Sequence, residues 1–246
     1  MSTACTVYAI ENAVDVRSAV AKINRRGALL VYPIKNSPEP ASLWSEFHPK
    51  TKMRWEWDET GDDRVADLWR LRERVSKSGK AVYAKWYQAR ATFFSREIFP
   101  YLVAALGGHE GSLSPTARKV LKVLEEDSPL STKELKKRTG LVGKDSERTY
   151  DKALKELWNP LFIVGFGEIE DGAFGSLAVG ATSVLFDDLW NEAQSIDQAD
   201  AETELRNRLG EKSLFYRQFL KFKQTPMKRA ITPTHGFIRY EDLVKK

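Results

Sequence analysis

Basic side chains at helical spacing are the best candidates for chemistry in this sequence. The segment 146–158 has apolar residues on one side, and its outward side with the preceding turn carries Lys144, Ser146, Arg148, Thr149, Lys152 and Lys155. Such side chains neutralise DNA phosphates, and the third helix of a helix-turn-helix motif enters the major groove. The pattern predicts DNA contact, to which the preceding segment is expected to add Lys133, Lys136 and Lys137.

Acidic residues in the same region leave an alternative open. The segment also contains Asp145, Glu147, Asp151 and Glu156, which dilute the positive charge. A solvated helix face in a protein-interaction or structural module would have the same pattern. Further along, Glu168, Glu170 and Asp171 lie at the expected tip of a hairpin, where they would repel phosphates. Either this hairpin points away from nucleic acid or the module binds another partner.

The elements around this segment predict a winged helix-turn-helix unit. Ser114 and Pro115 start a first helix, because a hydroxyl caps free amides and proline suits the first helical position. Ser131 and Glu134 form a capping box for a second helix, which Gly140 ends. After the third helix come strands at 161–166 and 173–179. Three helices followed by a β-hairpin is the winged helix order.

The rest of the chain predicts a second unit of mixed structure and a tail. The N-terminal part alternates helices at 14–25, 41–47, 62–77 and 95–106 with strands at 28–34, 52–57 and 80–87. We expect an α/β (α+β) fold of tandem winged helix-turn-helix-like units with small β-sheets. The expected divisions are an N-terminal α/β winged-helix-like unit (1–107), a winged helix-turn-helix (112–186) and a helical extension with a basic and aromatic tail (187–246).

Aromatic residues in two places could stack on bases. In the tail, basic residues alternate with aromatics, which suits a groove for a nucleic-acid backbone; the alternative is that Leu214, Phe215, Phe219 and Phe222 form the buried stripe of a terminal helix. Five tryptophans of the N-terminal part could stack on an extruded base, although their spacing favours core packing for most: Trp44, Trp55, Trp57, Trp69 and Trp86.

Composition excludes several classes of protein. The chain has 246 residues, a net charge of +5, one cysteine and three histidines, so we expect neither an internal disulfide nor a thiolate zinc cluster. No apolar run approaches the length of a membrane span, and the first residues do not resemble a secretory signal. Phosphate-loop, nucleophile-elbow and zinc-helix motifs are absent. The sequence therefore predicts a cytoplasmic protein without a cofactor or metal site, and leaves its oligomeric state open.

Several segments resemble the small AlkZ-related proteins of the AlkZ/YcaQ-like winged-helix superfamily. The resemblance lies in Ser128-Pro129-Leu130-Ser131-Thr132-Lys133-Glu134-Leu135-Lys136, in Gly140-Leu141-Val142-Gly143-Lys144 and in Tyr150-Asp151-Lys152-Ala153-Leu154-Lys155-Glu156-Leu157. It continues in Tyr32-Pro33-Ile34-Lys35, in Leu43-Trp44, and in Lys85 with Arg90-Ala91-Thr92-Phe93. It covers roughly residues 10 to 190 and implies tandem winged helices and double-stranded DNA, damaged DNA included, as the partner, with Lys85 and Arg90 among the contacts.

The resemblance also implies where catalytic residues would lie, and this sequence has different residues at that position. Some members of the superfamily are DNA glycosylases, in which two glutamines separated by one residue follow the first strand and position a water molecule. Here the corresponding segment reads Tyr32-Pro33-Ile34-Lys35-Asn36, without such a pair. We therefore expect a repair-related DNA-binding protein without this chemistry. The alternatives are a glycosylase or lyase that uses Lys35, Asn36 and Glu39, in which a desolvated lysine would be the nucleophile, and a noncatalytic interaction module.

Overall fold

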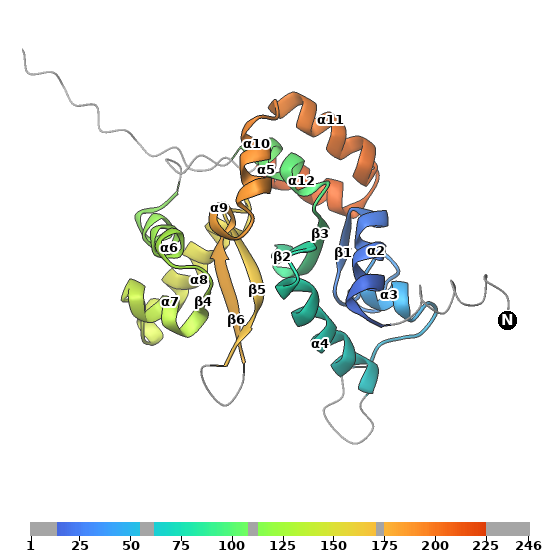
Figure 1. Ribbon diagram of the computed structural model, residues 1–246, viewed down its shortest axis with the longest axis horizontal. Coiled ribbons are helices and arrows are strands. Elements are labelled where there is room, and N and C mark those ends of the chain that lie inside the picture. The colour runs from blue at the N-terminus through green and yellow to red at the C-terminus, as the bar shows by residue number, and fades with distance from the viewer. Residues whose placement is uncertain (1–13, 55–61, 108–112, 171–174, 225–246) are drawn as a thin grey trace, which may run out of the picture.

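The chain folds around one antiparallel sheet. The computed structural model describes residues 14–54, 62–107, 113–170 and 175–224. Six strands follow in the order β1-β3-β2-β5-β6-β4 (Figure 1). Their bounds are β1 Ala28–Leu30, β2 Ala81–Tyr87, β3 Arg90–Ser95, β4 Leu130–Ser131, β5 Ile163–Ile169 and β6 Ser176–Ala181. Helices surround the sheet, so the α+β class expected from the sequence is confirmed.

The sheet is built from two runs of elements with the same order. The first run is α2 (Val16–Arg26), β1, α3 (Leu43–Phe47), α4 (Asp63–Lys77), β2 and β3; the second is α6 (Pro115–Glu126), β4, α7 (Thr132–Thr139), α8 (Lys144–Trp158), β5 and β6. Corresponding elements match in length, since α4 and α8 have 15 residues each and β2 and β5 have seven. Each run has the winged helix order, and α4 and α8 are the two third helices.

The two runs meet where β2 pairs with β5, which we call the β2–β5 junction. There Tyr83 lies opposite Gly165. A Cβ atom on Gly165 would lie 2.3 Å from Cδ1 of Tyr83, so only glycine leaves room for this ring. Because side chains alternate along a strand, Tyr83 and Lys85 point to one face of the sheet and Trp86 to the other. The small sheets expected for separate units are therefore joined into one.

Each face of the sheet is covered by its own helices. On the face of Tyr83, α2, α3 and α4 enclose a core that includes Leu29, Leu68 and Phe93. The opposite face is covered by α5 (Phe99–Leu106) and α12 (Leu214–Gln224), with α9 (Thr182–Leu185), α10 (Asp187–Gln194) and α11 (Gln198–Leu209) close by (Figure 1). There the ring of Trp86 lies 5.2 Å from that of Phe222.

The aromatic residues of the terminal segment are part of the core. Phe215 and Phe219 are buried on α12, and the Phe215 ring lies 5.4 Å from that of Tyr87. The alternative that these residues form the buried stripe of a helix is therefore confirmed. Their faces are not available to bases. The tail beyond residue 224 lies outside the described residues.

The predicted N-caps Ser114 and Ser131 and the predicted end at Gly140 are confirmed, but only the Ser131 half of the capping box is present, because the Glu134 carboxylate accepts a hydrogen bond from Nε of Arg138. The Ser114 side chain accepts a hydrogen bond from the Ala117 amide, and that of Ser131 accepts one from the Glu134 amide. Gly140 ends α7 in the left-handed conformation, with a φ of 68°. These local interactions fix both ends of α7 and the start of α6.

Three predictions for the first run are wrong. The sequence did not predict β3, although residues 90–95 pair with both β1 and β2. Residues 52–54 of the predicted strand 52–57 are not in a strand, and the remainder lies outside the described residues. Trp69 was expected in the core but is 45% exposed, because buried Leu68, Leu71 and Val75 form the inner stripe of α4.

Candidate nucleic-acid interface

The exposed side of α8 gathers four basic side chains. The helix buries Tyr150, Ala153 and Leu157 in its own unit, which turns the opposite side to solvent. Exposed basic residues recur there at spacings of four, four and three, which places them on one stripe that we call the α8 basic face: Lys144, Arg148, Lys152 and Lys155. Thr149 is exposed beside this stripe, whereas Ser146 is half-buried.

Two of the four acidic residues of α8 are bound within the fold. Glu147 accepts a hydrogen bond from Nζ of Lys136 at 2.7 Å, and Glu156 accepts one from the backbone amide of Ser114 at 3.0 Å. Within the described part of the chain, the four residues of the α8 basic face make no ion pair or hydrogen bond through their side chains. The acidic residues therefore dilute the charge of this face less than their number suggests.

The lysines of α7 differ in the contacts that their side chains make. Lys136 pairs with Glu147, and its Nζ lies 4.9 Å from the centroid of the Tyr150 ring. This lysine therefore binds α7 to α8. Nζ of Lys137 lies 3.9 Å from a carboxylate oxygen of Glu134, a contact that solvent screens. Lys133 is exposed at the first turn of α7.

Lys85 extends the positive charge from α8 toward α4. Burial lowers the pKa of Lys85, the nearby Arg72 guanidinium of α4 lowers it further, and the carboxylate of Asp151 on α8 acts in the opposite direction. Its neighbours thus come from both third helices. Arg90, by contrast, is exposed at the start of β3, next to the turn that follows β2.

A buried ion pair at the β2–β5 junction was not predicted from any sequence pattern. Arg72 is 6% exposed, and its Nη2 atom donates to a carboxylate oxygen of Glu168 on β5. Its guanidinium carbon lies 3.8 Å from the ring centroid of Trp69, and burial raises the pKa of the adjacent Tyr83 hydroxyl. Glu168 therefore belongs to β5, where it binds α4, and is not part of a free acidic tip. Residues 171–174 lie outside the described residues.

Comparison with known proteins assigns the chain to a family. The sequence model of the AlkZ-related family matches residues 14–217, which span both runs and most of the terminal helices. The chain belongs to the AlkZ-related family. No curated protein and no solved structure was found to match it. The resemblance predicted from the sequence is confirmed, and the family's fold is that of repair-related proteins.

The predicted catalytic residues of this AlkZ-related protein lie together in the connection after β1. Lys35 and Asn36 have φ angles of 51° and 57°, and Lys35 and Glu39 are exposed. The Asn36 amide holds the backbone of Met53 from both sides: Nδ2 donates to its carbonyl oxygen at 3.0 Å, and Oδ1 accepts from its amide at 2.7 Å. Asn36 thus has a structural role, and the chemical roles of the three residues stay predictions.

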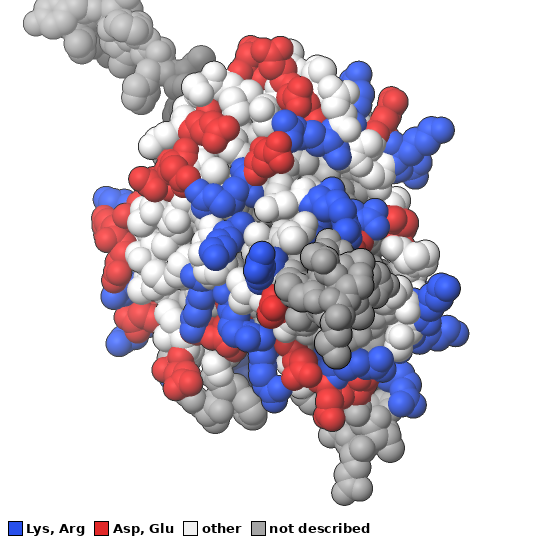
Figure 2. Space-filling model, turned by 45° about the vertical axis from the view of Figure 1, so that its right-hand side comes forward, with Lys and Arg blue, Asp and Glu red and all other residues white. Residues whose placement is uncertain are grey.

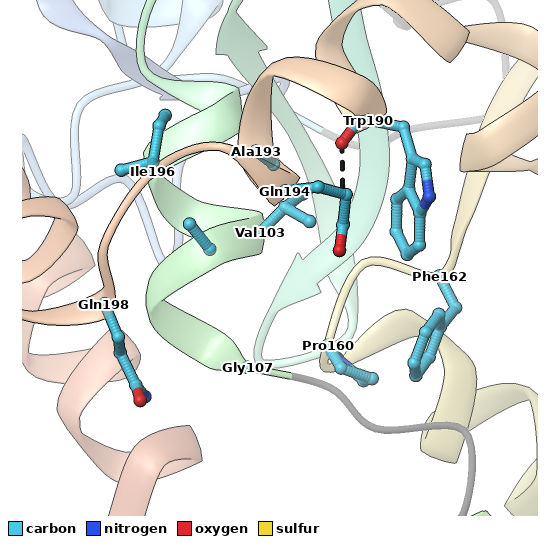
Figure 3. Close-up of a pocket in the computed structure, with 10 residues that line it drawn as sticks. Val103, Gly107, Pro160, Phe162, Trp190, Ala193, Gln194, Ile196 and Gln198 are labelled. Atoms are coloured by element: carbon cyan, nitrogen blue, oxygen red, sulfur yellow. Dashed lines mark hydrogen bonds between the residues drawn. The ribbon is translucent and has the colours of Figure 1, made fainter.

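A pocket elsewhere contains no group for acid–base chemistry. A cavity of about 250 Å³ lies between α5, α10 and the connection from α8 to β5 (Figure 3). Most of the residues that line it have apolar side chains, with Phe162 and Trp190 on one side, and the amides of Gln194 and Gln198 are its polar side chains. Among the described residues, no cluster of three or more His, Cys, Asp or Glu side chains could hold a metal ion. No described helix is long and apolar enough to cross a membrane.

Proposed function

We propose that this AlkZ-related protein binds double-stranded DNA, and that the α8 basic face makes the main contact. The observation behind the proposal is that Lys144, Arg148, Lys152 and Lys155 share one exposed stripe and have no ion-pair or hydrogen-bond partner among the residues that the structure describes. The stripe lies on the third helix of a winged helix order, which is the helix that enters the major groove in this motif. Phosphate neutralisation by four cations supports sequence-independent affinity.

The proposal includes a setting in DNA repair without base excision. Membership in the AlkZ-related family supports the setting, and the sequence lacks the glutamine pair that the superfamily's glycosylases use. The protein would thus recognise duplex DNA, damaged DNA included, and leave the glycosidic bond intact. The position of Lys35 supports this, because its side chain is exposed to solvent and does not lie in an enclosed apolar pocket.

Charge reversal on α8 tests the contact. Fluorescence anisotropy with a labelled duplex at low salt should give a weaker affinity for Arg148→Glu/Lys152→Glu than for the wild type. At about 1–3 kcal/mol for each of the two contacts, the loss should be at least about 30-fold. The matched control is Lys212→Glu/Arg217→Glu, which changes the net charge equally near the terminal helix. Equal losses in both variants would mean that only net charge matters, and no binding by the wild type would refute the proposal.

A second assay tests the absence of excision. The protein is incubated with duplexes that contain an alkylated base or an abasic site, and strand breaks after alkali are resolved on a gel. We expect no product above the protein-free control. Excision that Lys35→Ala abolishes would instead establish the lyase alternative.

A further inference from the structure

Trp69 is unlike the other aromatic residues of the described part of the chain. It is 45% exposed, whereas Trp44 and Trp86 are buried, and the other exposed large hydrophobic residues there are Val142 and Val184. The other described Phe, Tyr and Trp side chains are buried or half-buried, so the exposed indole of Trp69 needs a physical reason. Its own helix does not require it, because α4 packs through Leu68, Leu71 and Val75.

The fold holds the Trp69 ring from one side. The Arg72 guanidinium, 3.8 Å from the ring centroid, is fixed by its ion pair with Glu168 across the β2–β5 junction. Arg72 Nε is the single buried side-chain nitrogen or oxygen without a hydrogen-bond partner among the described residues. The ring stack and the ion pair, not a full set of hydrogen bonds, therefore set the position of Arg72. The indole is preorganised, and its remaining surface faces solvent.

The surroundings of Trp69 select the chemistry of a ligand. A cation already occupies one face of the ring, so a second cation is disfavoured and a neutral aromatic ring is favoured. The next exposed stripe of α4 carries Arg70, Arg74 and Lys77, spaced four and three residues apart. Arg70 pairs with Asp67 at 3.0 Å and Lys77 with Glu73 at 2.7 Å, and because these pairs are exposed to solvent, they are weak enough for a phosphate to compete. Figure 2, turned by 45° so that the right-hand side of Figure 1 comes forward, shows Lys and Arg side chains from the centre of the view downward, with Asp and Glu side chains among them. A ligand that carries both an aromatic ring and a phosphate group could stack on Trp69 and contact the basic side chains of α4.

We infer that Trp69 is a stacking platform for an unpaired base of DNA, and that the basic residues of α4 hold the adjoining phosphates. The inference rests on the proposed function, and it adds a second contact on the other third helix. In a fully paired duplex the faces of the bases are stacked on one another, so Trp69 gains nothing from them. A bulged or unpaired base exposes a face that the indole can cover. The protein would therefore prefer DNA with a local defect in pairing.

Three labelled probes test the inference by anisotropy: a matched duplex, the same duplex with one bulged nucleotide, and the single strand. Wild type should bind the bulged duplex more tightly than the matched one. Since stacking on one base contributes a factor of roughly 5 to 100, Trp69→Ala should weaken binding of the bulged duplex by that factor. Binding of the matched duplex should change less than about twofold, because α8 supplies that affinity.

Two further variants complete the design. Trp69→Phe keeps an aromatic face and should retain most of the preference, whereas Val184→Ala truncates another exposed hydrophobic side chain and should change nothing. Equal affinity of the wild type for matched and bulged duplexes would overturn the inference and leave the proposed function standing. An equal loss on all three probes in Trp69→Ala would also overturn it. If the wild type binds none of them, both proposals fail.

Discussion

Removal of the Glu168 carboxylate should destabilise the whole chain, because its ion pair with Arg72 joins the two runs of elements. The side chains of Arg72 and Glu168 are 7% and 17% exposed, so Glu168→Gln leaves a buried guanidinium without its counter-charge. Breaking a buried pair in this way costs about 3–5 kcal/mol. Because Glu168 keeps some contact with water, we expect about 3 kcal/mol, which lowers the melting temperature by roughly 6–12 °C for a chain of this size.

Urea unfolding followed by circular dichroism measures the effect, with Glu170→Gln as the matched control. Glu170 is the next carboxylate along the chain and is exposed, so its substitution should cost less than about 0.5 kcal/mol. Arg72→Met/Glu168→Gln removes the buried charge together with its partner and should recover most of the lost stability. If Glu168→Gln costs no more than Glu170→Gln, water screens the pair and the reasoning about the junction is refuted.

Three further predictions concern other parts of the fold. Gly165→Ala should cost about 1–3 kcal/mol in thermal unfolding because its Cβ would overlap the Tyr83 ring; full stability in this variant would contradict the close packing of β2 on β5. Ser131→Ala removes the N-cap of α7 and should cost about 1 kcal/mol, whereas Ser131→Asp should not. Burial lowers the pKa of His48 below 6.5, so its contribution to stability is complete above pH 6.5 and is lost as the pH falls; the decline from pH 7 to 5 should be shallower in His48→Gln.

Local sequence predicted the second run well because its boundaries depend on local interactions. Ser114, Ser131 and Gly140 each fix a helix end through contacts within a few residues. The stripe of α8 follows from the helical period alone, so the buried and exposed sides of that helix could be assigned from the sequence.

The first run was harder to predict because its turns lack the usual residues. The connection from β2 to β3 is made by Gln88 and Ala89, whose φ angles are 50° and 59°. Hairpins with this geometry normally use glycine or asparagine there, so nothing in the sequence marks the turn. The predicted strand 80–87 was therefore not followed by a second strand, and residues 90–94 of β3 were assigned to no element.

The junction between the runs could not be predicted from sequence patterns. The partners Arg72 and Glu168 are 96 positions apart, and Tyr83 and Gly165 are on different runs. Because periodicity reports only neighbours along the chain, Trp69 was placed in the core and Glu168 at a solvated tip. No repeat is evident in the sequence itself, and the two runs correspond in the order and lengths of their elements.

The salt dependence of DNA binding tests the central proposal most directly. Each phosphate neutralised by a cation contributes about −0.9 to the slope of log Kobs against log salt concentration. Anisotropy titrations from low to moderate salt should therefore give a slope that is smaller in magnitude by about 3 to 4 when alanine replaces Lys144, Arg148, Lys152 and Lys155 together. An unchanged slope in this variant, with its fold intact by circular dichroism, would show that DNA is not held by α8.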